Sequence, residues 1–127
     1  MQDHNEWLKF AFEDLKAAKK LISGEDPLIG SATFHTQQCA EKSLKGFLAY
    51  SGAPLRRIHD LTALVSFCKK IDAEFLDIES EAASLNPYLC QTRYPEDSFL
   101  MVDLTTAYIS IDQAEKIYDL VMSKIIF

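Results

Sequence analysis

The sequence contains few of the features on which disulfide-rich, exported or membrane-spanning proteins depend. Its 127 residues include three cysteines, an odd number without Cys-x-x-Cys spacing, which argues against a disulfide framework and favours a reducing compartment. No apolar run approaches the roughly 18–20 residues of a membrane-spanning helix. The residues that follow Met1 are polar and acidic. We therefore expect a cytoplasmic protein that does not cross a membrane.

The chain also lacks an excess of positive charge. The chain has thirteen Lys and Arg residues and nineteen Asp and Glu residues, which gives a net charge of −6 and a pI near 5.0. Strong general binding of nucleic acid is therefore not expected. Residues 65–127 hold eleven acidic residues but only five basic ones: Lys69, Lys70, Arg93, Lys116 and Lys124. Any recognition of phosphate must therefore depend on a few basic residues at one place. Among those of the acidic half, Arg93 is the main candidate.

Glycine and proline are scarce as well, at four residues each, and neither an alternating strand pattern nor a hairpin dipeptide is present. Apolar residues with helical spacing predict helices over about 5–22, 27–50, 60–71, 73–85 and 98–125. With 48% hydrophobic residues, the chain fits one domain over residues 1–127. We expect an all-α fold, an up-and-down bundle of four long helices plus one short helix.

Particular helix faces are expected to be buried. The predicted core of the 5–22 helix includes Phe10, and that of the 73–85 helix includes Leu76. Small residues recur along the 27–50 helix and predict that a neighbouring helix approaches closely there: Ala32, Thr36, Cys39, Ser43 and Gly46. A second apolar stripe on the last helix, Val102, Ile109 and Leu120, indicates contact with either the 73–85 segment or another subunit.

The ends of the helices carry capping signals. Asp26 precedes Pro27 and is expected to cap the second helix, and Asp72 is expected to cap the 73–85 helix. His59 and Asp60 stand at the start of the third helix. Its free amide groups could bind an anion, but capping by Asp60 is the favoured interpretation.

Motifs for phosphate loops, dinucleotide folds, zinc proteases, serine hydrolases and calcium loops are all absent. His35 and Cys39 have the spacing of a metal-binding pair, but no second pair accompanies them, so we expect neither a metal nor another cofactor. Two segments remain as candidates. One is the polar face of the second helix, which spacing alone predicts to be a solubilising surface: Gln37, Gln38, Glu41, Lys42 and Lys45. The other comprises His59-Asp60 and, in the loop of residues 86–98, Thr92-Arg93-Tyr94-Pro95. There Arg93 suits phosphate recognition or an ion pair with Asp60, Glu41 or another acid.

Three segments together resemble a known family. They are Phe34-His35-Thr36-Gln37-Gln38-Cys39-Ala40-Glu41-Lys42-Ser43-Leu44-Lys45-Gly46-Phe47-Leu48, then His59-Asp60-Leu61 with Leu64, then Thr92-Arg93-Tyr94-Pro95. In order and spacing they are similar to the HEPN domain (higher eukaryotes and prokaryotes nucleotide-binding), over about residues 5–125. The resemblance implies a helical bundle, commonly a homodimer, often encoded beside a minimal nucleotidyltransferase as a toxin–antitoxin-like pair.

Ribonucleases of that family resemble one another in an Arg-x(4–6)-His motif, in which histidine transfers protons and arginine stabilises the phosphorane. No histidine follows Arg56, Arg57 or Arg93 at that spacing. The resemblance therefore implies a non-catalytic module that binds a nucleotide, a minimal nucleotidyltransferase, or both. Two alternatives stay open: a metal-independent RNA-cleaving toxin whose atypical site pairs Arg93 with His59, and a structural dimeric adaptor.

The resemblance also marks individual positions. It implies nucleotide-binding positions at Lys42, Lys45, His59, Arg93 and Tyr94. A structural polar network is expected from Gln38, Glu41 and Asp60.

Overall fold

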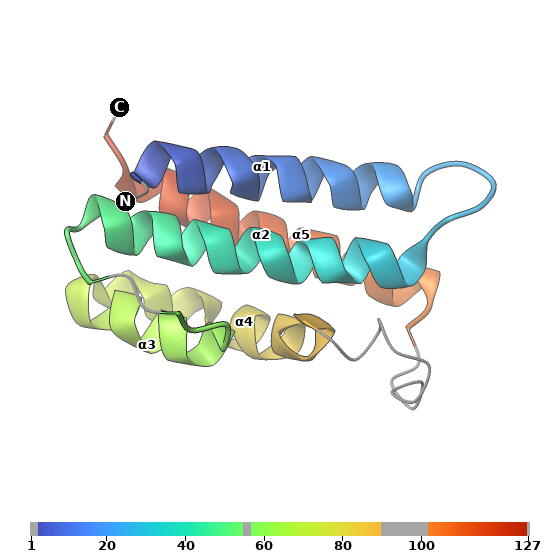
Figure 1. The fold of residues 1–127 in the computed structure, drawn as a ribbon. Helices are drawn as coiled ribbons and strands as arrows, with labels where there is room; N and C mark the ends of the chain where they lie inside the picture. The colour runs from blue at the N-terminus through green and yellow to red at the C-terminus, as the bar shows by residue number, and fades with distance from the viewer. Residues whose placement is uncertain (1–2, 55–56, 90–101, 127) are drawn as a thin grey trace.

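The computed structural model describes residues 3–54, 57–89 and 102–126, and these residues contain helices and no strand. Five α-helices and two 3₁₀ helices follow one another along this part of the chain (Figure 1). They are α1 (His4–Leu21), α2 (Ile29–Tyr50), α3 (Leu61–Ile71), η1 (Ala73–Ile78), α4 (Glu79–Leu85), η2 (Asn86–Leu89) and α5 (Leu104–Lys124). The predicted all-α bundle is confirmed.

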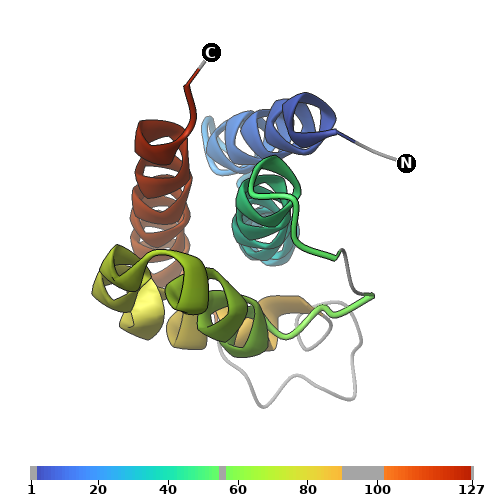
Figure 2. The same cartoon turned by 90° about the vertical axis from the view of Figure 1, so that its left-hand side faces the viewer.

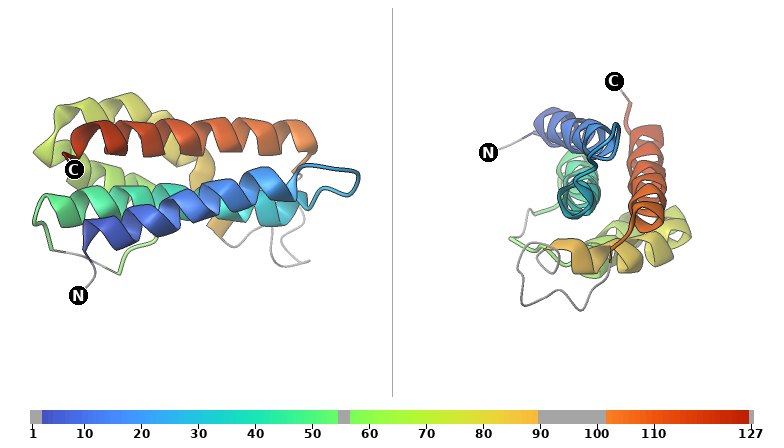
Figure 3. Two further views of the ribbon diagram at one scale, coloured as in Figure 1. Left: turned by 90° about the horizontal axis from the view of Figure 1, so that it is seen from above. Right: turned by 90° about the vertical axis from the view of Figure 1, so that its right-hand side faces the viewer.

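Helix α2 lies at the centre of the bundle. It contacts α1, α3, α4, η2 and α5, and none of its residues from 32 to 50 is exposed. Viewed along the helices, α1 and α5 lie on two sides of α2, and the segment from α3 to α4 covers a third side (Figure 2). Helices α1, α2 and α5 run side by side along their length (Figure 3). The long axis of the bundle therefore follows α2.

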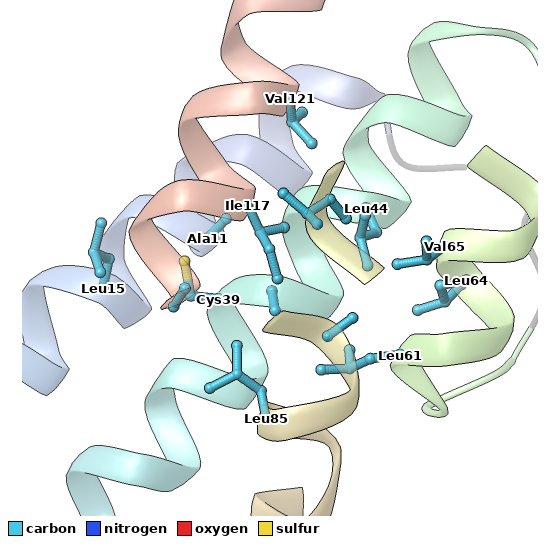
Figure 4. Close-up of a cluster of buried hydrophobic side chains, with 14 of the residues drawn as sticks. Ala11, Leu15, Cys39, Leu44, Leu61, Leu64, Val65, Leu85, Ile117 and Val121 are labelled. Atoms are coloured by element: carbon cyan, nitrogen blue, oxygen red, sulfur yellow. The ribbon is translucent and has the colours of Figure 1, made fainter. Parts of the chain in front are cut away.

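The small residues of α2 allow this close packing, as predicted. Ala32, Thr36, Cys39 and Ser43 are completely buried. At Gly46 a Cβ atom would lie only 2.9 Å from Cδ2 of Leu8 on α1. Figure 4 shows Cys39 and Leu44 of α2 among core side chains from α1, α3, α4 and α5. The fold depends on small side chains where its central helix meets α1.

Several helix boundaries differ from those predicted. Helix α2 begins at Ile29, and its N-cap is Leu28, which offers no side-chain cap, so the prediction that Asp26 caps this helix is wrong. The backbone N–H of Leu28 instead donates to the carbonyl of Leu21 at 2.7 Å, which closes the turn after α1. The single helix predicted over 73–85 is divided into η1 and α4, although Asp72 caps its start as predicted. Helix α5 starts after its cap at Asp103.

Two of the predicted core side chains lie at the surface. Phe10 is 47% exposed and Leu76 is 59% exposed. The second stripe predicted for the last helix is divided, because Val102, which precedes α5, and Leu120 pack against the core while Ile109 stays half exposed. Helix α5 contacts α4 and η1, but the partner of this stripe stays a prediction. In the described ranges, no helix is both long and apolar enough to cross a bilayer.

Candidate functional site

The polar positions of α2 are largely buried. Gln37 is completely inaccessible, and the side chains of Glu41 and Lys45 are 7% and 8% exposed. The interpretation of this face as a solubilising surface is therefore wrong for these three residues. The physical reason is the central place of α2, whose neighbours leave it no fully exposed face. Gln38 and Lys42 remain partly accessible.

Glu41 is the centre of a polar cluster, which we call the Glu41 cluster: Gln37, Gln38, Glu41, Lys45 and His59. Its Oε2 atom lies 3.0 Å from Nζ of Lys45 and 3.0 Å from Nδ1 of His59. Gln37 donates to Oε1 at 3.2 Å, and Gln38 donates to Oε1 of Gln37 at 2.7 Å. The structure thus brings together four of the predicted site and network residues and adds Gln37.

The charges of the Glu41 cluster are balanced. A buried carboxylate is costly unless an opposite charge and hydrogen bonds compensate it, and Lys45 and Gln37 supply both. The ammonium of Lys45 also lies 5.5 Å from the ring centroid of Trp7, within the range of a cation–π contact. Lys45 is therefore held between Glu41 and Trp7, inside the cluster.

His59 is the accessible member of this cluster. Its side chain is 61% exposed, although its Nδ1 is bonded to the buried Glu41. With Glu41 ionised, Nδ1 carries the proton and donates it in this bond, because a carboxylate is only an acceptor. The other ring nitrogen, Nε2, is then an acceptor in the neutral ring and a donor in the charged ring. The cluster presents one oriented imidazole to solvent.

Lys42 belongs to a separate cluster that the sequence did not predict. Its Nζ lies 2.7 Å from Oδ2 of Asp14 on α1, and Nδ1 of His35 lies 2.8 Å from Oδ1 of the same carboxylate. The ammonium of Lys42 is 6.0 Å from the ring centroid of the exposed Phe10. Asp14 is 8% exposed. The sequence did contain a signal for the burial of Asp14. It stands three residues after Ala11 and four before Ala18, a spacing that places it on the apolar face of α1.

Asp60 caps α3, as predicted. It accepts from the backbone N–H groups of Thr62 and Ala63 at 3.0 and 3.4 Å, and from the Thr62 hydroxyl at 2.6 Å. Asn86 donates to the same oxygen at 3.0 Å and accepts from the Leu61 N–H at 2.9 Å. The Thr62 hydroxyl, followed by the backbone donors, holds the pKa of Asp60 below its usual range. Asp60 occupies the amide groups of Thr62 and Ala63, and Asn86 occupies that of Leu61, so none of the three is open to an anion. The described hydrogen bonds of Asp60 do not reach Gln38 or Glu41, so its predicted place in their network is wrong.

Arg93 and Tyr94 lie outside the described residues, as do Arg56 and Cys90. Their expected contribution to the site stays a prediction. The loop predicted over 86–98 is described only as far as Leu89, and its first four residues form η2.

The spacing of His35 and Cys39 does not bring them to a common partner. His35 contacts Asp14, whereas Sγ of Cys39 lies 4.0 Å from Oγ of Ser43. Burial raises the pKa of the Cys39 thiol to about 12, so it is protonated at neutral pH. Within 3–54, 57–89 and 102–126, no group of three His, Cys, Asp or Glu side chains is arranged to hold a metal ion.

The sequence model of the HEPN domain matches residues 4–125. The chain belongs to the HEPN family. The resemblance carried by its three segments is therefore confirmed. Two of those segments, around Glu41 and around His59, meet in this HEPN fold through the hydrogen bond between these two side chains.

Solved structures and a curated relative are similar to this HEPN chain. The crystal structure of TT1696 from Thermus thermophilus superposes with a TM-score of 0.85 at 26% identity, covering 98% of this chain and all of that one. ST0689, described as an archaeal HEPN homologue, gives a TM-score of 0.79 at 27% identity and covers 98% of both chains. "Putative toxin MJ1304" from Methanocaldococcus jannaschii is 30% identical over an alignment of 99 residues that covers 73% of this chain and 64% of that protein. The chain thus spans less than two thirds of that relative's length.

Proposed function

We propose that this HEPN chain is a non-catalytic member of a toxin–antitoxin-like pair and binds a nucleotide at the exposed face of the Glu41 cluster. One observation carries the proposal: His59 is 61% exposed while its Nδ1 is fixed by a buried carboxylate. An imidazole fixed in this way presents Nε2 to a phosphate or a ribose hydroxyl without first losing much rotational freedom. His59 is the residue of the cluster through which a nucleotide would be contacted.

The charges around His59 support binding of an anion. Lys45 compensates Glu41 inside the cluster, so the carboxylate does not oppose a phosphate as a bare negative charge would. Lys45 itself is 8% exposed, and in this proposal it holds Glu41 in place and does not touch the ligand. Lys42 is paired with Asp14 in the other cluster and is 26% exposed, so this proposal does not use it as a ligand contact. Arg93 and Tyr94 stay proposed ligand contacts by residue type alone, since a guanidinium can bind a phosphate through two hydrogen bonds and a tyrosine ring can stack on a base.

Thermal shift with the monophosphates and triphosphates of the four common nucleosides tests this proposal. A ligand at 100 times its Kd stabilises a protein by about 2.7 kcal/mol, which raises Tm by several degrees in a domain of this size. We expect a shift with at least one nucleotide, and its loss in His59→Ala. His35→Ala is the matched control, because His35 is also held by a carboxylate through Nδ1 but lies in the other cluster. Equal shifts in the wild type and His59→Ala would contradict the proposal.

The partner half of the proposal rests on the family and on the relative. The name of MJ1304 is "Putative toxin". The resemblance to HEPN domains implies a gene for a minimal nucleotidyltransferase next to that of this chain. The excess of acidic residues over 65–127 would favour contact with a basic surface on such a protein. We expect a complex that survives gel filtration when the chain is co-expressed with a nucleotidyltransferase encoded beside it, and relief of any growth arrest caused by the chain alone. No complex and no growth effect would contradict this half.

A second function is favoured by the same pair of residues. A histidine oriented by a carboxylate is an arrangement used in acid–base catalysis, so His59 could transfer protons in metal-independent cleavage of RNA. The acidic chain and the missing Arg-x(4–6)-His spacing oppose this function. Incubation of RNA with the protein in EDTA decides between them: cleavage that is lost in His59→Ala and kept in His35→Ala would establish the ribonuclease.

We also propose that the chain forms a homodimer along the seam between α1 and α5. Leu104, Tyr108, Glu115 and Tyr118 share one face of α5 by their spacing. That face borders α1, because Glu115 pairs with Lys19 and Tyr118 contacts the ring of Phe12. Phe12, Leu104 and Tyr108 are 51%, 39% and 54% exposed, which is typical of an interface rather than a free surface. Sedimentation equilibrium should give a dimer, and Tyr108→Glu a monomer.

A further inference from the structure

A cavity of about 190 Å³ lies between the second half of α2, residues 53–54 and α3. Its walls include the apolar side chains of Leu48, Ala53, Leu64 and Phe67 and two lysines, Lys45 and Lys70, and no acidic residue of the described ranges lines it. Pockets for drug-sized ligands run from about 300 to 1,000 Å³, whereas an engineered apolar cavity of about 150 Å³ holds benzene. The cavity therefore has the size of one apolar side chain or one ring.

A lysine without a carboxylate partner stands at this cavity. Among the described basic residues of the acidic half, Lys69, Lys116 and Lys124 each pair with an acidic side chain. Lys70 has no such ion pair within the described ranges, and its ammonium lies 5.4 Å from the ring centroid of Phe67. Lys70 is thus a cation beside an apolar cavity, on a protein whose net charge is −6. A ligand that carries both an apolar group and an anion matches this combination.

The composition of the walls distinguishes between two such ligands. A nucleotide base has amide-like polar edges, and burying an amide without a hydrogen bond costs roughly 1–3 kcal/mol by protein mutational data. Among the residues that the structure describes, the polar side chains that line the cavity are Lys45 and Lys70. Their ammonium groups can donate to a base but cannot accept from its N–H groups. The side chain of Phe or Leu has no polar edge, and a neighbouring Asp or Glu on the same peptide would supply the anion. The walls favour a peptide over a base.

We infer that the cavity binds an acidic peptide segment of a partner protein, with one large apolar side chain seated against Phe67 and a neighbouring carboxylate paired with Lys70. The contact requires no nucleotide, although Lys45, which lines one wall of the cavity, also belongs to the Glu41 cluster. Burial of the apolar side chain supplies most of the affinity. The ion pair at the exposed Lys70 contributes less and mainly sets the preference for acidic neighbours.

The probe is the capped tripeptide acetyl-Glu-Phe-Glu-amide, followed by ¹H–¹⁵N NMR of the full chain. We expect saturable shifts at Leu48, Ala53 and Phe67. Replacing the central Phe of the peptide with Ala should weaken binding roughly tenfold or more, and acetyl-Lys-Phe-Lys-amide should also bind more weakly. No shifts with the acidic peptide, or equal affinity for the three peptides, would overturn the inference.

Two variants of the protein test whether the peptide binds in this cavity. Lys70→Gln should weaken binding about two- to fivefold, whereas the matched control Lys69→Gln should not, because Lys69 pairs with Glu79. Ala53→Leu should fill the cavity and abolish binding, and its fold is checked by circular dichroism; if it does not fold, Lys70→Gln still decides. Unchanged affinity in Lys70→Gln would overturn the inference. Shifts at the same residues with AMP or UMP in place of the peptide would assign the cavity to a nucleotide and overturn it as well.

Discussion

Nδ1 of His59 lies 3.0 Å from Oε2 of Glu41, although the two residues are 18 positions apart in the chain. This bond fastens the segment before α3 to the middle of α2. It also joins two of the three segments by which the chain resembles the HEPN family. Glu41 is buried and His59 is exposed, so the pair connects the interior of the bundle to its surface.

Glu41→Gln should destabilise the protein strongly. The substitution leaves Lys45 charged and nearly inaccessible without its carboxylate, and breaking a buried ion pair in this way costs about 3–5 kcal/mol. Urea denaturation followed by circular dichroism measures the free energy of unfolding. Lys19→Met is the comparison, because the Lys19–Glu115 pair is exposed and should contribute less than about 1 kcal/mol.

The control for this loss is the double variant Glu41→Gln with Lys45→Met, which should recover part of it. Replacing both charged side chains leaves no uncompensated ion. The stability lost in the double variant should therefore be smaller than the sum of the losses in the two single variants. Strict additivity in the double-mutant cycle would show that the two side chains do not interact, against the observed distance of 3.0 Å.

Asp60→Ala should cost about 1 kcal/mol, because α3 loses its cap. Asp60→Asn retains an acceptor oxygen and should cost less. The pair of variants separates capping from charge, and thermal unfolding at neutral pH measures both. Equal losses in the two variants would show that the hydrogen bonds from Thr62 and Ala63 are not what stabilises this end of α3.

Stability should fall in acid. The pKa values of Asp60, Asp72 and Asp103 lie below the usual range, chiefly because of the Thr62 hydroxyl, the Lys124 ammonium and the Thr106 backbone N–H respectively. A carboxyl whose folded pKa is depressed stabilises the fold above its unfolded pKa of about 3.9, and this contribution is lost as pH falls through the folded pKa. We expect Tm to decline below about pH 5, and less steeply in Asp60→Asn.

The helices of this fold were predictable because local patterns determine them. Asp60 and Asp72 stand before apolar periodic segments and cap their helices as expected. The division of residues 73–85 into η1 and α4 was not predictable, because both parts bury their apolar residues, among them Phe75, Ile78 and Leu85. The exposure of Phe10 was missed because helical spacing gives a direction but not the width of the face that neighbouring helices cover.

The Glu41 cluster was predictable only in part. The spacing of Glu41 and Lys45 indicated their ion pair. Its burial follows from the central position of α2, which depends on contacts with α1, α5 and α3–α4 that no local pattern shows. Asn86 and Asp14 were missed because each acts on a residue 25 or more positions away: Asn86 on Leu61, and Asp14 on Lys42.

Gly46→Ala should lower stability by roughly 1 kcal/mol, although alanine favours helix more than glycine does. The new Cβ would lie 2.9 Å from Cδ2 and 3.1 Å from Cγ of the buried Leu8, and overpacking of this kind costs about 1–3 kcal/mol. Combining it with Leu8→Ala should show favourable coupling in a double-mutant cycle. A more stable Gly46→Ala variant would contradict the close approach of α1 to α2.

The most direct test of the proposed nucleotide site is an NMR titration that follows the imidazole Cε1–Hε1 resonance of His59 as nucleotides are added. The account predicts a saturable shift of this resonance, with a smaller shift for the imidazole of His35, and much weaker binding in Glu41→Gln if that variant remains folded. A His59 resonance that stays unmoved by every common nucleotide at millimolar concentration would contradict it.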